Sequence, residues 1–210
     1  MRLSLIAMSG SGKTYWANQM AGSGFRCLSC DEMIATRLKP ELAAADGTPL
    51  AMGKWMGFPY QTGYVERESK YLHYERLALE EIMDFIASAN AGSGKDIVVD
   101  TTGSVIYTGK HLLNSLRKFT TVVHLATPLE IQEQMYQAYL KSPRPVLWRG
   151  KYARLPGETT GEALARCYPK LLSYREGRYK KLAHLTIDYH KYRKSDFTIK
   201  NFLDEVRRGM

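Results

Sequence analysis

Near the start of the chain, two glycines, a lysine and a threonine follow an apolar run, a combination that can hold a phosphate. The stretch reads LIAMSGSGKTYW and begins at Leu5. In the phosphate-loop pattern G-x-x-x-x-G-K-[ST], backbone N–H groups surround the anion and the lysine reaches its outer phosphates. Gly12, Lys13 and Thr14 match the end of this pattern, whereas Ala7 stands where its first glycine is expected. The stretch therefore predicts a phosphate-binding loop between a strand and a helix.

The same loop predicts the ligands ATP and Mg²⁺. Lys13 is expected to act in catalysis, and the Thr14 hydroxyl is expected to ligate Mg²⁺. We expect ATP rather than GTP, because neither N-K-x-D nor T-K-x-D occurs where a guanine would be recognised. A chance match in a surface loop is the alternative. The residues expected to bind the nucleotide are Ser9, Gly10, Ser11, Gly12, Lys13 and Thr14.

An aspartate lies where a second strand is expected to end. Asp31 follows the predicted strand Phe25–Ser29 and opens a predicted helix. In a parallel sheet such a carboxylate stands at the carboxyl edge, beside the crevice in which ligands bind. It could orient the hydroxyl of a phosphate acceptor or accept its proton, so Asp31 is a candidate catalytic and substrate-binding residue. The alternative is a helix N-terminal charge that the helix dipole stabilises.

A second aspartate, Asp100, ends the apolar strand IVVD, and we expect it to lie near Mg²⁺ or its waters. The small residues Thr102, Gly103 and Ser104 follow. Such a turn lets a substrate approach the backbone closely, so these three residues are candidates for binding the acceptor. The alternative is a simple strand-to-helix turn in which Ser and Thr serve as caps.

A long irregular segment, KSPRPVLWRGKYARLPGETTG at 141–161, interrupts the alternation of strands and helices. A loop of this length inside a compact domain is usually functional or disordered. Arg144, Arg149 and Arg154 could close over the nucleotide, because the planar guanidinium binds phosphate through two hydrogen bonds. We expect a mobile lid in which Arg144 binds ATP and acts in catalysis. A solvated basic loop is the alternative.

A frame of alternating strands and helices must position these residues. Apolar runs predict strands at 2–7, 25–29, 96–100, 119–127 and 184–188. Helices are expected at 12–20, from 31 onward, at 66–90, 109–117, 129–140 and 162–181, and after Thr198 as an N-cap. This alternation predicts a three-layer P-loop NTPase fold of the α/β class, with a parallel five-stranded sheet and helices on both faces. An irregular, partly helical insertion is expected on the substrate side at about 40–65.

Composition indicates the setting of the protein. The 210 residues carry a formal net charge of +9, which favours anionic partners such as nucleotides, phosphorylated metabolites or nucleic acid. No stretch of about 18 apolar residues occurs, so no membrane span is expected. No signal peptide is visible, and three cysteines fit free thiols in a reducing compartment, so we expect a cytoplasmic location.

Taken together, these motifs resemble those of the shikimate kinase family, which belongs to the nucleoside-monophosphate-kinase-like P-loop enzymes. The shared order is the phosphate loop, Asp31, a long helix, DTTGS, an RP loop and YREGRYKKLAHLTID. The likeness covers about residues 3–40 and 66–208, and residues 41–65 have no clear counterpart. The resemblance implies phosphoryl transfer from ATP, with Mg²⁺, to a hydroxyl group.

The resemblance also implies roles for individual residues. Asp31 falls on the base-like aspartate of the family, and Gly103 falls within its substrate loop. Arg144 falls on the lid arginine. Arg175, four residues before Tyr179, falls on an arginine that contacts the carboxylate of the substrate. Arg175 is therefore expected to bind the acceptor.

At several substrate-binding positions the chain departs from the family. The triple glycine of the substrate loop reads TGS at 102–104, and the first of two aspartates is Ser29. A second substrate arginine, expected near the start of the long helix, is replaced by Leu72, with Arg67 and Arg76 as displaced candidates. Fold and phosphoryl transfer follow from the resemblance, whereas shikimate as the acceptor does not.

A weaker likeness suggests a different acceptor. LSCDEMI and VVDTTGS also resemble polynucleotide-kinase-like P-loop kinases, in which the aspartate at the position of Asp31 activates a hydroxyl at a nucleic-acid end. The net charge fits this reading, but no basic stripe with interleaved aromatic residues occurs outside the lid and the tail. Nucleic acid stays open as an acceptor but is not favoured.

We therefore expect residues 1–210 to form one P-loop kinase domain that phosphorylates a hydroxyl of a small, anionic molecule. Two alternatives stay open: a nucleic-acid or nucleotide kinase, and a regulatory module that binds ATP without transferring phosphate. The resemblance leads us to expect a monomer.

Overall fold

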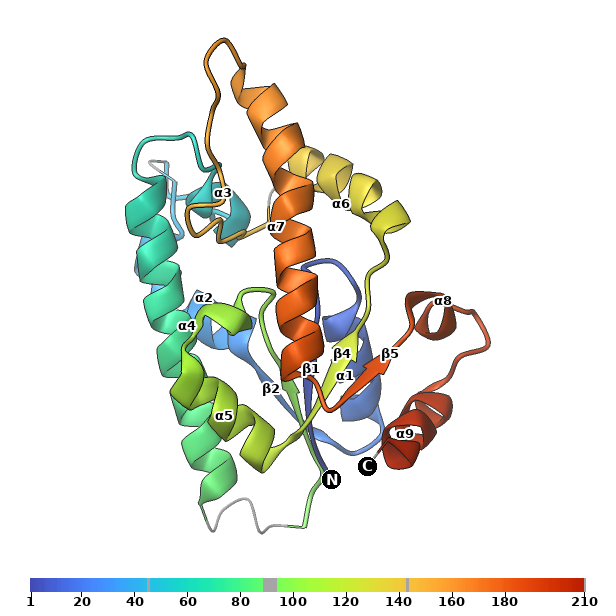
Figure 1. Ribbon diagram of the computed structural model, residues 1–210. Helices are drawn as coiled ribbons and strands as arrows, with labels where there is room; N and C mark the ends of the chain where they lie inside the picture. Colours follow the sequence, from blue (N-terminus) through green and yellow to red (C-terminus); the bar gives the residue numbers. More distant parts are fainter. Residues whose placement is uncertain (45, 89–93, 143, 210) are drawn as a thin grey trace.

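Five parallel strands form the centre of the molecule (Figure 1). The computed structural model describes residues 1–44, 46–88, 94–142 and 144–209. The strands are β1 (Arg2–Ile6), β2 (Arg26–Ser29), β3 (Ile97–Asp100), β4 (Thr121–Leu125) and β5 (Leu185–Ile187). They lie in the order β2-β3-β1-β4-β5, and every pairing is parallel. The central strand is therefore β1, the one that leads into the phosphate loop.

Nine helices surround this sheet in the described residues. They are α1 (Lys13–Gly22), α2 (Cys30–Leu38), α3 (Met52–Met56), α4 (Tyr64–Ala87), α5 (Lys110–Phe119), α6 (Leu129–Lys141), α7 (Thr160–Leu182), α8 (Tyr189–Tyr192) and α9 (Ile199–Arg208). Short 3-10 turns occur at η1 (Lys39–Glu41) and η3 (Val105–Tyr107). In the part of the chain that the structure describes, none of these helices combines the length and the apolar character that crossing a membrane requires.

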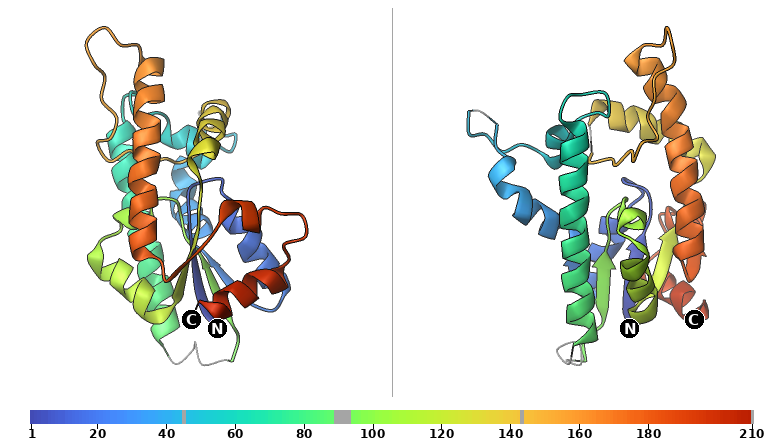
Figure 2. Two further views of the ribbon diagram at one scale, coloured as in Figure 1. Left: turned by 45° about the vertical axis from the view of Figure 1, so that its right-hand side comes forward. Right: turned by 60° about the vertical axis from the view of Figure 1, so that its left-hand side comes forward.

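Helices cover both faces of the sheet, as the two views of Figure 2 show. Because side chains alternate along a strand, Leu3 and Leu5 of β1 face one side and Ile6 faces the other. Helices α1 and α9 pack on the first side, and α2, α4, α5 and α7 pack on the second. The expected three-layer α/β fold is confirmed, with one apolar core on each side of the sheet.

The expected elements are present with shifted ends. Each strand is one or two residues shorter than its predicted range at one or both ends, and the long helix runs from Tyr64 to Ala87. Residues 89–90, the predicted end of that helix, lie outside the described residues. The expected N-cap is confirmed, because the Thr198 hydroxyl accepts the N–H of Asn201 at 3.4 Å. The sequence did not predict α8, which is a single turn.

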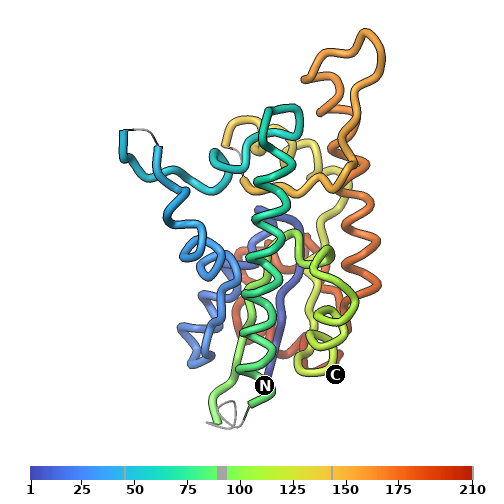
Figure 3. Tube along the Cα trace, turned by 90° about the vertical axis from the view of Figure 1, so that its left-hand side faces the viewer, coloured from blue at the N-terminus to red at the C-terminus, as the bar shows by residue number. Residues whose placement is uncertain are grey.

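The insertion and the lid lie on opposite sides of α4 when the molecule is seen from the direction of Figure 3. Within the insertion the structure has α3 and the first two residues of α4, which agrees with the partly helical character expected there. The lid segment joins α6 to α7 and is not uniformly exposed. Val146, Leu147 and Trp148 are buried, whereas residues 149–157 are mainly exposed. The lid therefore has a buried middle part, and an exposed outer part follows it.

Candidate active site

The strand order brings the predicted charged residues to one edge of the sheet. The phosphate loop follows β1, Asp100 ends β3, and Asp31 lies two residues beyond the end of β2. These three strands are neighbours, and in the β2–β3 pairing Ser29 lies opposite Asp100. The carboxyl ends of parallel strands open into one crevice, so the three segments face a common space.

The phosphate loop has the backbone geometry of an anion cradle. Gly10 and Gly12 have φ angles of 89° and 105°, in the left-handed region that favours glycine. A Cβ atom on Gly10 would lie 3.3 Å from Nη1 of Arg144, so this position also needs the space. Among the described residues, Arg149 alone has a positive φ without being glycine. Ala7 therefore occupies a position where this loop does not require glycine.

Lys13 is buried, and two carboxylates act on its charge. Its ammonium donates to the carbonyl oxygens of Ala7 at 3.3 Å and Met8 at 3.4 Å. Burial lowers the pKa of Lys13, and the negative charges of Asp100 and Asp31 oppose this effect. Burial likewise raises the pKa of Asp100, and the Lys13 charge opposes that shift. The ammonium and the two carboxylates therefore form one coupled electrostatic group.

Asp100 and Thr14 fit the requirements of a Mg²⁺ site that is completed by a nucleotide. Within the described residues, Oδ1 of Asp100 is buried and has no hydrogen-bond partner, so it can bind a metal-bound water. No group of three or more His, Cys, Asp or Glu side chains in that part of the chain could hold a metal ion. Mg²⁺ usually binds through one or two protein groups, phosphates and waters, which matches this sparse donor set.

The carboxylate of Asp31 is half-buried and held by an aromatic hydroxyl. Tyr71 donates to Oδ1 of Asp31 at 3.0 Å. The N-cap of α2 is Ser29, whose hydroxyl accepts the N–H of Glu32 at 3.3 Å. Because Ser29 performs the capping, Asp31 is free to interact with ligands across the crevice.

The small-residue turn after β3 packs against the phosphate loop. A Cβ atom on Gly103 would lie 3.1 Å from the backbone nitrogen of Ser9, so a side chain there would push the two loops apart. The hydroxyls of Thr102 and Ser104 both donate to Glu75 of α4, and Ser104 does so at 2.7 Å. The structure thus places these two hydroxyls on a buried carboxylate, whereas the sequence predicted that they contact the acceptor.

Glu75 is a site residue that the sequence analysis missed. It is 1% exposed, and burial raises its pKa to about 7, although the hydrogen bonds from Thr102 and Ser104 lower it. A signal was present in the sequence, since Glu75 lies three residues after Leu72 and four before Leu79, within the apolar stripe of the helix. A carboxylate in such a stripe requires buried partners, and Thr102 and Ser104 supply them.

Arg175 lies where α7 meets the lid. It is 2% exposed, and its Nη2 donates to the carbonyl of Leu147 at 2.7 Å. Its guanidinium lies 5.6 Å from the centre of the Tyr107 ring. Arg175 also acts electrostatically on Glu75, whose pKa it lowers. The residue therefore supports the lid from α7 and influences the charge of Glu75.

The three lid arginines lie in different surroundings. Arg144 approaches Gly10 of the phosphate loop. Arg149 lies beside α4, and its Nη1 is 3.6 Å from Oε2 of Glu68. Arg154 donates twice to the carbonyl of Glu158, at 3.1 Å and 2.6 Å, within the outer loop. Of these three arginines, Arg144 is therefore the one that lies beside the phosphate loop.

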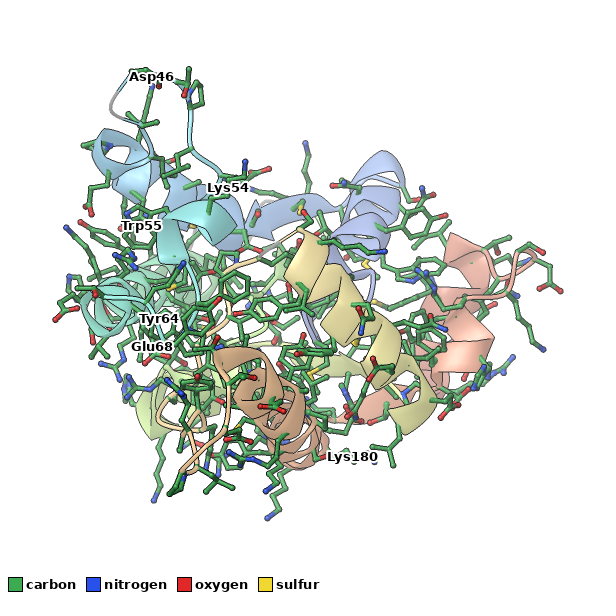
Figure 4. The ribbon with its side chains drawn as sticks, turned by 90° about the horizontal axis from the view of Figure 1, so that it is seen from above. Asp46, Lys54, Trp55, Tyr64, Glu68 and Lys180 are labelled. Atoms are coloured by element: carbon green, nitrogen blue, oxygen red, sulfur yellow. The ribbon has the colours of Figure 1, made fainter. Side chains whose placement is uncertain are left out.

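Side chains of α4 and α7 anchor the buried middle part of the lid. The Tyr64 hydroxyl lies 2.7 Å from the Val146 carbonyl and accepts the N–H of Trp148 at 3.0 Å. Glu68, which lies close to Tyr64 on α4 in Figure 4, accepts the N–H of Arg149 at 2.8 Å. With the bond from Arg175 to Leu147, backbone groups of four consecutive lid residues are satisfied by side chains.

A pocket of about 190 Å³ lies beside the phosphate loop. It extends from Ser9 and Gly10 along α6 to Tyr189 and Arg193. A Cβ atom on Gly12 would lie 3.6 Å from Nη1 of Arg193, which brings the segment after β5 to the loop. The sequence analysis did not identify Arg193, because only the return of the chain from β5 brings it near the N-terminus of α1.

Comparisons with known proteins support the fold. No protein-family model matches the sequence, and no match is found among curated proteins. Solved structures do match, including the shikimate kinase from Acinetobacter baumannii in complex with shikimate. Its TM-score is 0.61 at 20% identity, with 99% of this chain and 90% of that chain covered.

Two further solved structures have the same architecture. The shikimate kinase from Bacteroides thetaiotaomicron matches with a TM-score of 0.59 at 16% identity, covering 99% of this chain and 97% of that one. The dephospho-CoA kinase from Campylobacter jejuni matches with a TM-score of 0.55 at 12% identity, covering 99% and 98%. The fold is that of the P-loop kinases, in agreement with the resemblance noted in the sequence.

The contacts of the Tyr64 hydroxyl with the lid backbone predict that its removal lowers the stability of the protein. Tyr64→Phe removes the partner of two buried backbone groups of the lid, so we expect the free energy of unfolding to fall by about 1–3 kcal/mol. Tyr60→Phe is the matched control, because Tyr60 is exposed and its hydroxyl makes no hydrogen bond within the described residues; we expect a change within about 0.5 kcal/mol. Urea unfolding measures both, and equal stability of the two variants would contradict the anchor.

The buried carboxylate predicts a pH effect. Because the folded state raises the pKa of Glu75 from 4.5 to about 7, its contribution to stability is present at low pH and is lost as pH rises through this range. Glu75→Gln lacks this titration. The wild type should therefore lose stability relative to this variant. We expect the free energy of unfolding of the variant minus that of the wild type to increase by about 1–3 kcal/mol from about pH 5 to about pH 8. Urea unfolding across this range tests the prediction, and a pH-independent difference would contradict it.

Proposed function

We propose that this protein is an ATP-dependent kinase that transfers the γ-phosphate to a hydroxyl of a small molecule. The observation that supports this most directly is the group formed by Lys13, Asp100 and Asp31 at one sheet edge. A nucleotide switch or motor needs the lysine and the metal-side carboxylate. The further carboxylate of Asp31, held by Tyr71 at the mouth of the crevice, suits a reaction with an acceptor hydroxyl.

The phosphate loop would hold the nucleotide. The loop leads directly into the N-terminus of α1, where an anion is stabilised. The Lys13 ammonium would exchange its two carbonyl contacts for phosphate oxygens, while Thr14 and Asp100 would hold the metal. When bound, Mg²⁺ supplies positive charge that offsets the charge of the phosphates. The pocket that reaches Tyr189 and Arg193 would take the nucleoside end.

Asp31 would orient the acceptor hydroxyl and accept its proton as the bond from its oxygen to the γ-phosphorus forms, while the bond from that phosphorus to the bridging oxygen breaks and ADP leaves. Tyr71 fixes the carboxylate at 3.0 Å, which reduces the freedom of the reacting group. Arg144 beside Gly10 would stabilise negative charge on the transferred phosphoryl group. The anchored lid would exclude water from the site and so limit hydrolysis of ATP.

Loss of either central charged group should abolish transfer without unfolding the chain. For Lys13→Ala and Asp31→Ala we expect phosphoryl transfer to fall by about 10²- to 10⁴-fold, because each removes a group that acts on the reacting atoms. Transfer from labelled ATP should be measured with shikimate, other polyhydroxy acids, nucleosides and 5′-hydroxyl oligonucleotides. Full activity in both variants would refute the mechanism, and ATP binding without transfer to any acceptor would favour a regulatory module.

The lid arginines give a matched pair of variants. Arg144→Ala should lower kcat by about 10²-fold, because it removes charge next to the phosphate loop. Arg154→Ala should leave kcat nearly unchanged, because that guanidinium is bound to the Glu158 carbonyl in the outer loop. Steady-state kinetics with the acceptor found above measures both variants. Equal losses would show that the two arginines do not differ in function.

A further inference from the structure

Basic side chains gather where α5 lies beside the C-terminal half of α7. The two helices are neighbours on one face of the sheet (Figure 1 and Figure 2), and a groove of about 290 Å³ lies between them. A second groove, of about 360 Å³, shares Arg117 with the first and is also lined by the starts of β1 and β4. The basic residues of both grooves, which we call the α5–α7 basic surface, are Arg2, Lys110, Arg117, Lys118, Arg178 and Lys181. Three distant segments of the chain form this surface, so sequence spacing gives no sign of it.

No carboxylate balances the charges of the α5–α7 basic surface. None of the residues that line the two grooves is Asp or Glu. Within the described residues, none of the six basic side chains makes an ion pair. Elsewhere in the molecule, Arg37, Arg166 and Lys191 each pair with a glutamate. Like charges that face one groove repel each other, and such departures from local stability are expected at functional sites.

Helix dipoles account for some of these positions but not for all. Arg117, Lys118 and Lys181 lie in the last turns of their helices, where positive charge is stabilised. Lys110, however, is the first residue of α5, where positive charge is unfavourable, and the first turn of α5 has no acidic residue. Arg178 lies one turn before the end of α7 and is exposed. A negatively charged ligand would account for all of these positions.

Side chains in the second groove are held in place and still have donors for a ligand. Nη1 of Arg117 donates to the carbonyl of Ala183 at 3.1 Å, just beyond the end of α7. Nδ1 of His184 accepts the N–H of Val122 at 2.9 Å, so the proton of this ring is on Nε2, which can donate to a ligand oxygen. Burial and the charge of Arg117 lower the pKa of His184, so the ring is neutral at pH 7. These donors suit phosphate oxygens, which accept hydrogen bonds.

The α5–α7 basic surface is longer than a single phosphate group. Lys110 and Lys118 are eight residues apart on α5, which corresponds to about 12 Å along the helix axis. The second groove extends the positive charge to Arg2 at the start of β1. A polymer with regularly spaced negative charges therefore matches the surface better than one small anion.

Aromatic rings accompany the basic residues. Tyr174 lies one turn before Arg178 on α7 and is 40% exposed. Nζ of Lys151 in the lid lies 4.5 Å from the centre of the Tyr174 ring, which extends the positive charge along α7. Phe119 lines the second groove, and Nζ of Lys118 lies 5.2 Å from the centre of its ring. Basic grooves with aromatic side chains are typical of proteins that bind single-stranded nucleic acid, whose bases are free to stack.

A lipid membrane fits this surface less well than a nucleic acid. Stable attachment to a membrane usually requires apolar side chains that enter the lipid as well as basic charge. None of the exposed large aliphatic side chains in the described residues belongs to α5 or to the C-terminal half of α7. These side chains are Val65, Leu129, Leu140 and Leu155.

We propose that the α5–α7 basic surface binds the sugar–phosphate backbone of a single-stranded nucleic acid. The second groove lies at the amino edge of the sheet, where β1 and β4 begin, whereas the phosphate loop and Asp31 lie at the carboxyl edge. The nucleic acid is therefore a partner of the protein and not the phosphate acceptor. This inference goes beyond the proposed kinase function and does not depend on it.

Fluorescence anisotropy with a labelled oligothymidylate of about 16 nucleotides tests the proposal. A 5′-phosphate on the oligonucleotide removes the hydroxyl that a kinase could use, and no ATP is added. For Lys110→Gln with Lys181→Gln we expect binding to weaken by at least about tenfold at low salt. The slope of log K against log salt should fall by about 1.4, because two phosphate contacts are lost.

Two control proteins locate the binding. Lys54→Gln with Lys200→Gln removes the same charge from exposed lysines of α3 and α9, and the affinity should change by less than about twofold because distant charges are screened. Lys13→Ala should bind like the wild type, because the phosphate loop lies at the other edge of the sheet. Circular dichroism verifies that each variant is folded.

Several results would overturn the proposal. Absence of binding by the wild type, or equal weakening in the two double variants, would show that these grooves bind no nucleic acid specifically. A loss in Lys13→Ala as large as that in Lys110→Gln with Lys181→Gln would place the oligonucleotide in the candidate active site. Tighter binding of a duplex of the same length would refute the single-stranded class. Binding of phosphatidylserine vesicles without binding of the oligonucleotide would assign the surface to a membrane.

Discussion

The burial of the Lys13 ammonium, opposed electrostatically by the carboxylates of Asp100 and Asp31, is the constraint on which the predicted site depends. A buried ammonium is unfavourable unless opposite charges and hydrogen bonds compensate it. Here β3 and the segment after β2 bring the carboxylates, and the carbonyls of Ala7 and Met8 accept its protons. This arrangement requires β1 to lie beside β3, with β2 next in order. The sheet order is therefore part of the chemistry of the site.

A second layer of contacts fixes the loops around that group. Glu75 holds Thr102 and Ser104, which flank Gly103, and Gly103 in turn packs on the backbone of Ser9. The long helix α4 thereby positions the acceptor turn against the phosphate loop. The same helix anchors the lid through Tyr64 and Glu68. One helix thus holds both the turn at 102–104 and the buried middle part of the lid, which favours a site that would be assembled before ligands arrive.

The acceptor side is where this chain differs from the kinases that it resembles. The P-loop kinase fold agrees with the expectation, and the likeness to shikimate kinases at 16–20% identity covers nearly the whole chain. Where the resemblance expects the acceptor, however, Leu72 belongs to the core and Glu75 adds a buried carboxylate. A fold hosts different substrates through such local changes, so the acceptor must be argued from these residues and not from the architecture.

From the sequence by itself we could predict the phosphate loop, the positions of Asp100 at the end of a strand and of Asp31 shortly after another, and the alternation of strands and helices. These features depend on local spacing, and the rule that parallel strands share a carboxyl edge was enough to bring them together. Only the tertiary structure showed three sets of contacts. They are the hydrogen bonds from Thr102 and Ser104 to Glu75, the hydrogen bonds between Tyr64 and the lid backbone, and the packing of Arg175 against the Tyr107 ring. Glu75 lies 27 and 29 positions from its two partners, and Tyr64 lies 82 and 84 positions from the lid groups that it binds. No local pattern encodes contacts at such separations, because they arise only when packed helices bring distant side chains to the same buried space.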